Sequence, residues 1–79
     1  MRKFEYIVSD YSIHLSLSAT SLPNEIDISI MPVSSEKTTF KGSLDKLKRD
    51  IANTQLLKFV LDCVKEAKQV CLLSHRQLR

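Results

Sequence analysis

The spacing of hydrophobic residues changes between Gly42 and Ser43, and this change constrains the fold more than any other feature of the chain. Before it, apolar residues recur at every second position, as in the stretch from Tyr11 to Leu17. After it, they recur at every third or fourth position, as in Leu44 and Leu47. A period of two is typical of a strand with one buried face, and the longer period is typical of a helix. The sequence therefore predicts a small antiparallel sheet followed by helices.

Four segments of the first half are expected to form strands: residues 3–8, 11–19, 26–33 and 37–41. Ser9-Asp10 can turn the chain between the first two, although one long strand bent there is an alternative. Pro32 suggests that the third segment is an edge strand or ends at the proline, because proline cannot donate a ladder hydrogen bond. If it is an edge, a partner strand can add to it, with the proline blocking part of the edge.

Ser43 and Asp45 predict a helix start, because serine accepts a hydrogen bond from an early amide and an acidic residue suits the positive end of the helix dipole. One helix is expected from Ser43 to about Asn53 and a second from Gln55 to about Leu73. Asn53-Thr54 marks a break or kink between them, and the polar tail 74–79 is expected to fray.

The predicted fold class is α+β, with a three- or four-stranded antiparallel meander whose apolar face is covered by one or two C-terminal helices. The 79 residues are expected to form one small domain, with the sheet over about 3–42 and the helices over about 43–73. The residues expected to point into the core are Tyr6, Ile13, Leu15, Leu17, Ile28, Ile30, Phe40, Leu47, Ile51, Val60 and Val64.

The second helix carries more apolar surface than packing on one sheet requires. Its apolar side chains span about 220° of the helix circumference, whereas a helix lying on a sheet needs an apolar stripe of about 100°. The surplus is covered either by the first helix or by a second copy of the chain. Because one short helix would cover only part of it, we expect a homodimer through the Leu56–Leu73 helix. A structural subunit of a larger assembly is the alternative explanation.

The sequence contains no motif that predicts an enzyme. A single glycine excludes Gly-rich phosphate-binding loops, and Cys71 with His75 would supply only two metal ligands. A nucleophilic serine beside His14 also needs an orienting carboxylate and an oxyanion hole, which a flat strand face does not offer. We therefore expect no enzyme activity, no catalytic residue, no metal, no cofactor and no small-molecule substrate.

The cellular compartment is indicated by the cysteines and by the shortness of the apolar runs. Cys63 and Cys71 are separated by about 12 Å along a helix, too far for an intramolecular disulfide, so we expect two reduced and mostly buried thiols. The longest apolar run, residues 70–73, is far shorter than the roughly 20 residues of a membrane-spanning helix. The first residues do not form a signal-peptide core. A cytoplasmic protein without a membrane partner is expected.

Charge is unevenly distributed between the two halves. Residues 1–40 carry three basic and five acidic residues, whereas residues 41–79 carry nine basic and four acidic residues. The densest basic cluster is Lys46, Lys48 and Arg49, which we name the basic patch. A positive surface of this kind can contact an acidic protein or nucleic acid.

The second candidate surface is the polar side of the strand over residues 11–19. Ser12, His14, Ser16 and Ser18 alternate with apolar residues there and, together with Ser29 and Thr39, predict a flat face of small polar groups ringed by acidic and basic side chains. Such a face can serve as a docking surface for a protein partner.

In its size and its order of strands followed by helices, the chain resembles small adaptor and inhibitor proteins encoded by phages and other mobile elements, some anti-CRISPR proteins among them. The resemblance covers the architecture alone and assigns no role to any residue. It implies a non-enzymatic protein-interaction module that acts by occupying a partner's surface. The alternative is a small nucleic-acid-binding module that uses the basic patch.

Overall fold

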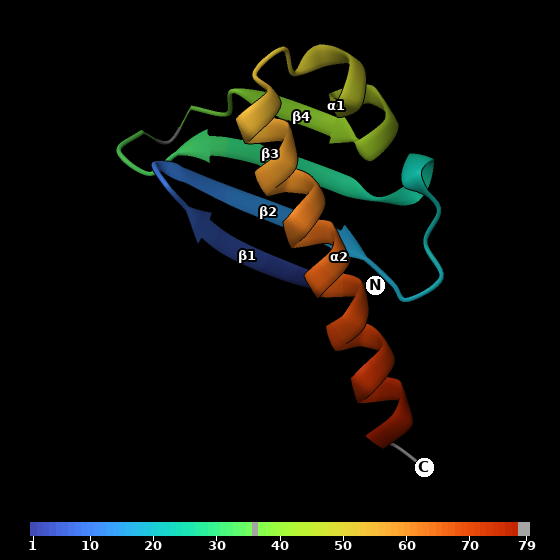
Figure 1. The fold of residues 1–79 in the computed structure, drawn as a ribbon. Coiled ribbons are helices and arrows are strands. Elements are labelled where there is room, and N and C mark those ends of the chain that lie inside the picture. The colour runs from blue at the N-terminus through green and yellow to red at the C-terminus, as the bar shows by residue number, and fades with distance from the viewer. Residues whose placement is uncertain (36, 78–79) are drawn as a thin grey trace.

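The chain folds into a four-stranded antiparallel sheet with a long helix crossing one of its faces (Figure 1). The computed structural model describes residues 1–35 and 37–77, with side chains described as far as residue 73. The strands follow one another in the sheet in their order along the chain, so the predicted α+β meander followed by helices is confirmed. The elements are β1 (Arg2–Val8), β2 (Tyr11–Leu17), η1 (Pro23–Glu25), β3 (Asp27–Pro32), β4 (Phe40–Ser43), α1 (Leu44–Asp50) and α2 (Thr54–Gln77).

A two-residue loop, Ser9-Asp10, joins β1 to β2, and the alternative of one bent strand is therefore wrong. Val8 pairs with Tyr11 immediately before and after the loop. Ser9 adopts a φ of 55°, as the first central residue of a type II′ hairpin turn does. The hairpin places Phe4, Tyr6 and Val8 on the same sheet face as the apolar residues of β2.

The third strand is an inner strand that ends at Pro32, so the expectation that the strand ends at the proline is confirmed and the alternative of an edge strand is wrong. β3 lies between β2 and β4, and Pro32 stands at its end, paired with Tyr11. The edges of the sheet are β1 and β4.

The last strand lies further along the chain than residues 37–41. It begins at Phe40, which pairs with Ile30, and it includes Gly42, which pairs with Ile28. The shift follows from the side-chain alternation, because this register places Phe40 on the apolar face beside Ile30.

The two helices are separated by a true break. The Ser43 hydroxyl accepts a hydrogen bond from the Lys46 amide at 3.2 Å, so the predicted helix start is confirmed. The chain leaves α1 after Asp50, and the Asn53 carboxamide oxygen then accepts hydrogen bonds from the amides of Gln55 and Leu56 at 3.0 and 3.1 Å. These bonds satisfy amides at the first turn of α2 that lack a helical partner.

The helix α2 continues to Gln77, past the expected end near Leu73 and into the tail that was expected to fray. Residues 78–79 of that tail lie outside the described residues. The helix has 24 residues, a length of about 36 Å, and its C-terminal part projects beyond the sheet (Figure 1).

The core lies between the sheet and the helices. The strands supply Ile13, Leu15, Leu17, Ile28 and Ile30, with Ile26 just before β3, while Leu44, Leu47, Ile51, Leu56, Val60, Cys63, Val64 and Ala67 come from the helices and the turn between them. Of the expected core residues, Tyr6 and Phe40 are half-buried and the others are buried. Both helices therefore contribute to the same apolar cluster, and the opposite face of the sheet is covered by no described helix.

Candidate functional site

The uncovered face of the sheet presents three cross-strand rows of side chains, which we name the open face. Antiparallel pairing defines them, because directly opposed residues point to the same side. The rows are Ile7–Ser12–Met31, then Glu5–His14–Ser29–Lys41, then Lys3–Ser16–Asp27–Ser43. Three of the predicted site residues, Ser12, His14 and Ser16, therefore lie on this face. Of the other two residues expected there, Ser29 lies beside His14, whereas Thr39 precedes β4.

A hydrogen-bonded chain joins Glu5, Ser12 and His14 across β1 and β2. The Ser12 hydroxyl donates to Oε2 of Glu5 at 3.0 Å and lies 3.0 Å from Nε2 of His14. Ser12 is buried beneath its neighbours, with 6% of its surface exposed, while the side chains of His14 and Glu5 remain 42% and 57% exposed. These hydrogen bonds orient the His14 imidazole at the centre of the open face.

These three hydrogen-bonded side chains include a carboxylate, which a serine–histidine nucleophile requires, but the direction of hydrogen-bond donation differs from that of such a nucleophile. A hydroxyl has one proton, and Ser12 donates it to Glu5, so Nε2 of His14 acts as the donor to Ser12. A nucleophilic serine passes its proton to the imidazole instead, and the carboxylate holds the other ring nitrogen. The arrangement favours a fixed polar surface over an activated nucleophile.

The remaining serines of the predicted polar strand differ in their placement. Ser16 is half-buried on the open face, with its hydroxyl 3.7 Å from the sulfur of Met1. Ser18 lies past the end of β2, and its hydroxyl is 3.1 Å from that of Ser21 in the following turn. Ser18 therefore lies outside the polar row of β2, because the strand ends at Leu17, and its role in partner binding stays a prediction.

The basic patch lies on α1, and its three residues are exposed. Lys46 is engaged twice: its Nζ donates to the Lys41 carbonyl oxygen at 3.2 Å and lies 3.6 Å from Oδ2 of Asp50. These contacts join the patch to the β4 edge of the open face. They also reduce its free positive charge, which comes mainly from Lys48 and Arg49.

Some side chains of the open face were missed by sequence reasoning. Ile7 is 67% exposed at one end of the first row, and Met31 is half-buried at the other end. Lys3 stands in the third row. Only the strand register brings these residues together, although the alternation along β1 indicates that its odd positions share the face opposite to the core.

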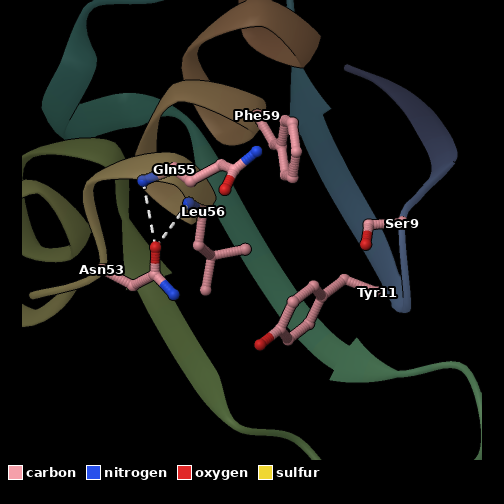
Figure 2. Close-up of a pocket in the computed structure, with 6 residues that line it drawn as sticks. All are labelled: Ser9, Tyr11, Asn53, Gln55, Leu56 and Phe59. Carbon is pink, nitrogen blue, oxygen red and sulfur yellow. Dashed lines mark hydrogen bonds between the residues drawn. The ribbon is translucent and has the colours of Figure 1, made fainter.

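The open face is hollowed only slightly. A shallow depression of about 370 Å³ is bordered by Lys3, His14, Ser16, Asp27, Ser29 and Met31. On the opposite side, a smaller hollow of about 160 Å³ lies between the β1–β2 loop and the first turn of α2. Figure 2 shows Ser9, Tyr11, Asn53, Gln55, Leu56 and Phe59 around it. Ligand pockets measure about 300–1,000 Å³. The smaller hollow lies below this range, and the depression lies near its lower end and is open to solvent.

The aromatic side chains lie toward the helices and not on the open face. Phe4, Tyr6, Tyr11, Phe40 and Phe59 are half-buried against the core. Phe4 and Tyr6 stack with ring centroids 6.2 Å apart, and the Arg2 guanidinium lies 5.3 Å from the Phe4 centroid. Base stacking by proteins uses exposed aromatic faces, which the open face lacks.

Among the described residues, no group of three or more metal-ligating side chains comes together, and the His75 side chain lies outside this set. Cys63 and Cys71 are free and buried. No helix in the described ranges has both the length and the apolar content to cross a membrane. Comparisons of the chain with protein-family models, with curated proteins and with solved structures find no significant match.

Proposed function

We propose that this protein is a non-enzymatic protein-interaction module, an adaptor or inhibitor that acts by occupying a partner's surface through its open face. The observation that carries the proposal is the composition of that face. Fixed polar groups at its centre, Ser12 and His14, are flanked by Ile7 and Met31 and by charged residues at the ends of the rows. A flat surface of hydrogen-bonding groups with apolar side chains beside it suits a protein partner.

The basic patch extends this surface at the β4 edge. Lys41 belongs to the second row, and Lys46 bonds to its carbonyl. Together with Lys48 and Arg49, these residues would steer association toward an acidic partner, and that steering would weaken with salt. Two free cysteines fit a reducing compartment, so we place the protein in the cytoplasm as part of the same proposal.

Nucleic-acid binding through the basic patch is the less supported alternative. Lys46 is engaged by Asp50 and Lys41, and the half-buried aromatics face the helices. Fluorescence anisotropy of labelled duplex DNA and single-stranded RNA at two salt concentrations tests it. Micromolar binding that falls steeply with salt and is lost in Lys48→Glu/Arg49→Glu would replace our proposal.

The proposal itself is tested by site-specific photocrosslinking in cells that express the protein naturally. A photoreactive amino acid replaces Ser29, at the centre of the open face, or Gln69, on the exposed side of α2. We expect a defined adduct with another protein from position 29 and none of that mass from position 69.

The Ser29→Arg variant is then expected to lose the same partner, while the matched variant Gln69→Arg retains it. Equal crosslinking from both positions would contradict the proposal, as would an adduct at position 29 with a second copy of the chain alone.

A further inference from the structure

The two edges of the sheet differ in how well they can accept another strand. β4 has four residues, and its Lys41 carbonyl already accepts a hydrogen bond from Nζ of Lys46. Short strands and lysines that cover an edge are common protections against strand addition. The β4 edge is therefore blocked by a neighbouring side chain.

The β1 edge has seven residues and is paired on one side only. Because only two residues separate Val8 from Tyr11, this pair exchanges both of its backbone hydrogen bonds. The bonding direction alternates along a strand. Lys3, Glu5 and Ile7 therefore direct their backbone N–H and C=O groups away from β2, toward the free side.

The sequence of this edge is complementary to itself. In an antiparallel pairing centred on Phe4, Lys3 of one copy lies opposite Glu5 of the other, and the same contact recurs on the other side of the two-fold axis. Met1 lies opposite Ile7 in the same arrangement. These are the two most exposed large apolar side chains in the described ranges, at 78% and 67% exposure. Both pairs lie on the open-face side.

We propose that β1 is a homodimer interface, in which a second copy of this chain adds its own β1 antiparallel about Phe4 and extends the sheet across both copies. On the helix side, the two Phe4 rings meet at the axis and cover the half-buried Phe4–Tyr6 stack. The symmetry also places both α2 helices on one face of the joined sheet, running in opposite directions.

The apolar surplus of α2 is a poorer contact for two copies. Leu61 and Leu72 are 38% and 46% exposed and lie on one side of the helix. Lys65 and Lys68 lie between them on that side. A two-fold pairing that joins Leu61 to the partner's Leu72 also brings Lys65 against the partner's Lys68, and like charges oppose association. The dimer through Leu56–Leu73 stays a separate prediction, and the same experiment tests it.

Sedimentation velocity of the full chain over a wide concentration range provides the test. The wild type is expected to sediment at twice the mass of the 9.0 kDa chain. Lys3→Glu and Glu5→Lys each oppose like charges at two symmetric positions, so each is expected to weaken the dimer about tenfold or more. Both residues are exposed, and circular dichroism checks that the variants fold.

Mixing the two single variants makes the assignment specific. In the mixed dimer each acidic side chain again faces a basic one, so we expect the dimer to return in the mixture and in the Lys3→Glu/Glu5→Lys double variant. The control Leu61→Lys alters α2 and is expected to leave the dimer intact. The proposal would be overturned by a monomeric wild type, by single variants that dimerise normally, or by a mixture that stays monomeric. It would also be overturned if Leu61→Lys dissociated the dimer and the two β1 variants did not. The proposal does not depend on the function of the open face.

Discussion

At the scale of single residues, Gly42 adopts a backbone conformation that residues with a side chain rarely adopt. Its φ is +151°, and a Cβ placed there would lie 2.7 Å from Cδ of Lys46. The end of the lysine side chain can move, so backbone strain should make up most of the penalty. We expect Gly42→Ala to lower the free energy of unfolding by about 1–3 kcal/mol in urea denaturation. The Gly42→Ala/Lys46→Ala variant, compared with Lys46→Ala, should keep most of that loss. Full recovery would indicate a steric cause.

Two side chains make the free energy of unfolding depend on pH in the alkaline range. Burial raises the pKa of the Cys63 thiol from its ordinary 9.0, with Glu66 and Asp62 adding to the effect. Burial also raises the pKa of Tyr6 from 10.0, with Glu66, Cys63 and Cys71 adding to it. The folded state favours both neutral forms, so this stabilisation is complete below the unfolded pKa values and is lost as the pH rises through the folded ones.

We therefore expect the free energy of unfolding to decline above about pH 9. The Tyr6→Phe/Cys63→Ala variant is expected to have a shallower decline than the wild type when both are unfolded in urea from neutral pH to pH 11. Comparing the slopes removes the contribution of the lysines, which both proteins share. Equal slopes would show that these two groups do not carry the effect.

At the scale of elements, the separation of the helices depends on the cap at Asn53. Its side chain serves two amides of the first turn of α2, and Asn53→Ala removes both bonds. We expect this variant to lose about 1 kcal/mol of unfolding free energy, measured by thermal or urea denaturation. Asn53→Asp retains an acceptor oxygen and should stay close to the wild type. Equal stability of the alanine variant would mean that water replaces the cap without cost.

At the scale of the whole molecule, the two faces of the sheet should differ in energy. Ile13 is fully buried on the helix side, while Ile7 is 67% exposed on the open face. Ile13→Ala is expected to cost about 2–5 kcal/mol, whereas Ile7→Ala should change the stability of the monomer by less than about 0.5 kcal/mol. A domain of 79 residues is stabilised by about 4–12 kcal/mol in all. Urea titrations below the dimerisation range check both values, and similar losses would contradict the assignment of faces.

Much of the fold could be predicted because its signals are local. The alternation from Tyr11 to Leu17 identified a strand and its buried side, Ser43 identified where α1 begins, and Asn53-Thr54 indicated a break or kink before α2. These signals depend on residues a few positions apart, and backbone geometry alone translates them into structure.

The candidate site could be predicted only in part. Ser12, His14 and Ser16 lie on one face, as the alternation predicted, whereas Ser18 lies past the end of β2, where its hydroxyl contacts that of Ser21. The Glu5–Ser12–His14 chain and the position of Ile7 beside Ser12 depend on register, which pairs residues that are distant in the sequence.

By itself, the sequence determined the class of fold, the kinds of elements and the side of each strand that is buried, since hydrophobic periodicity is a local property. Only the tertiary structure decided that β3 is an inner strand, that Lys46 covers the β4 edge, and that β1 remains open. The physical reason is that strand order and edge protection result from contacts between distant segments, and such contacts form only when the chain has packed around its core.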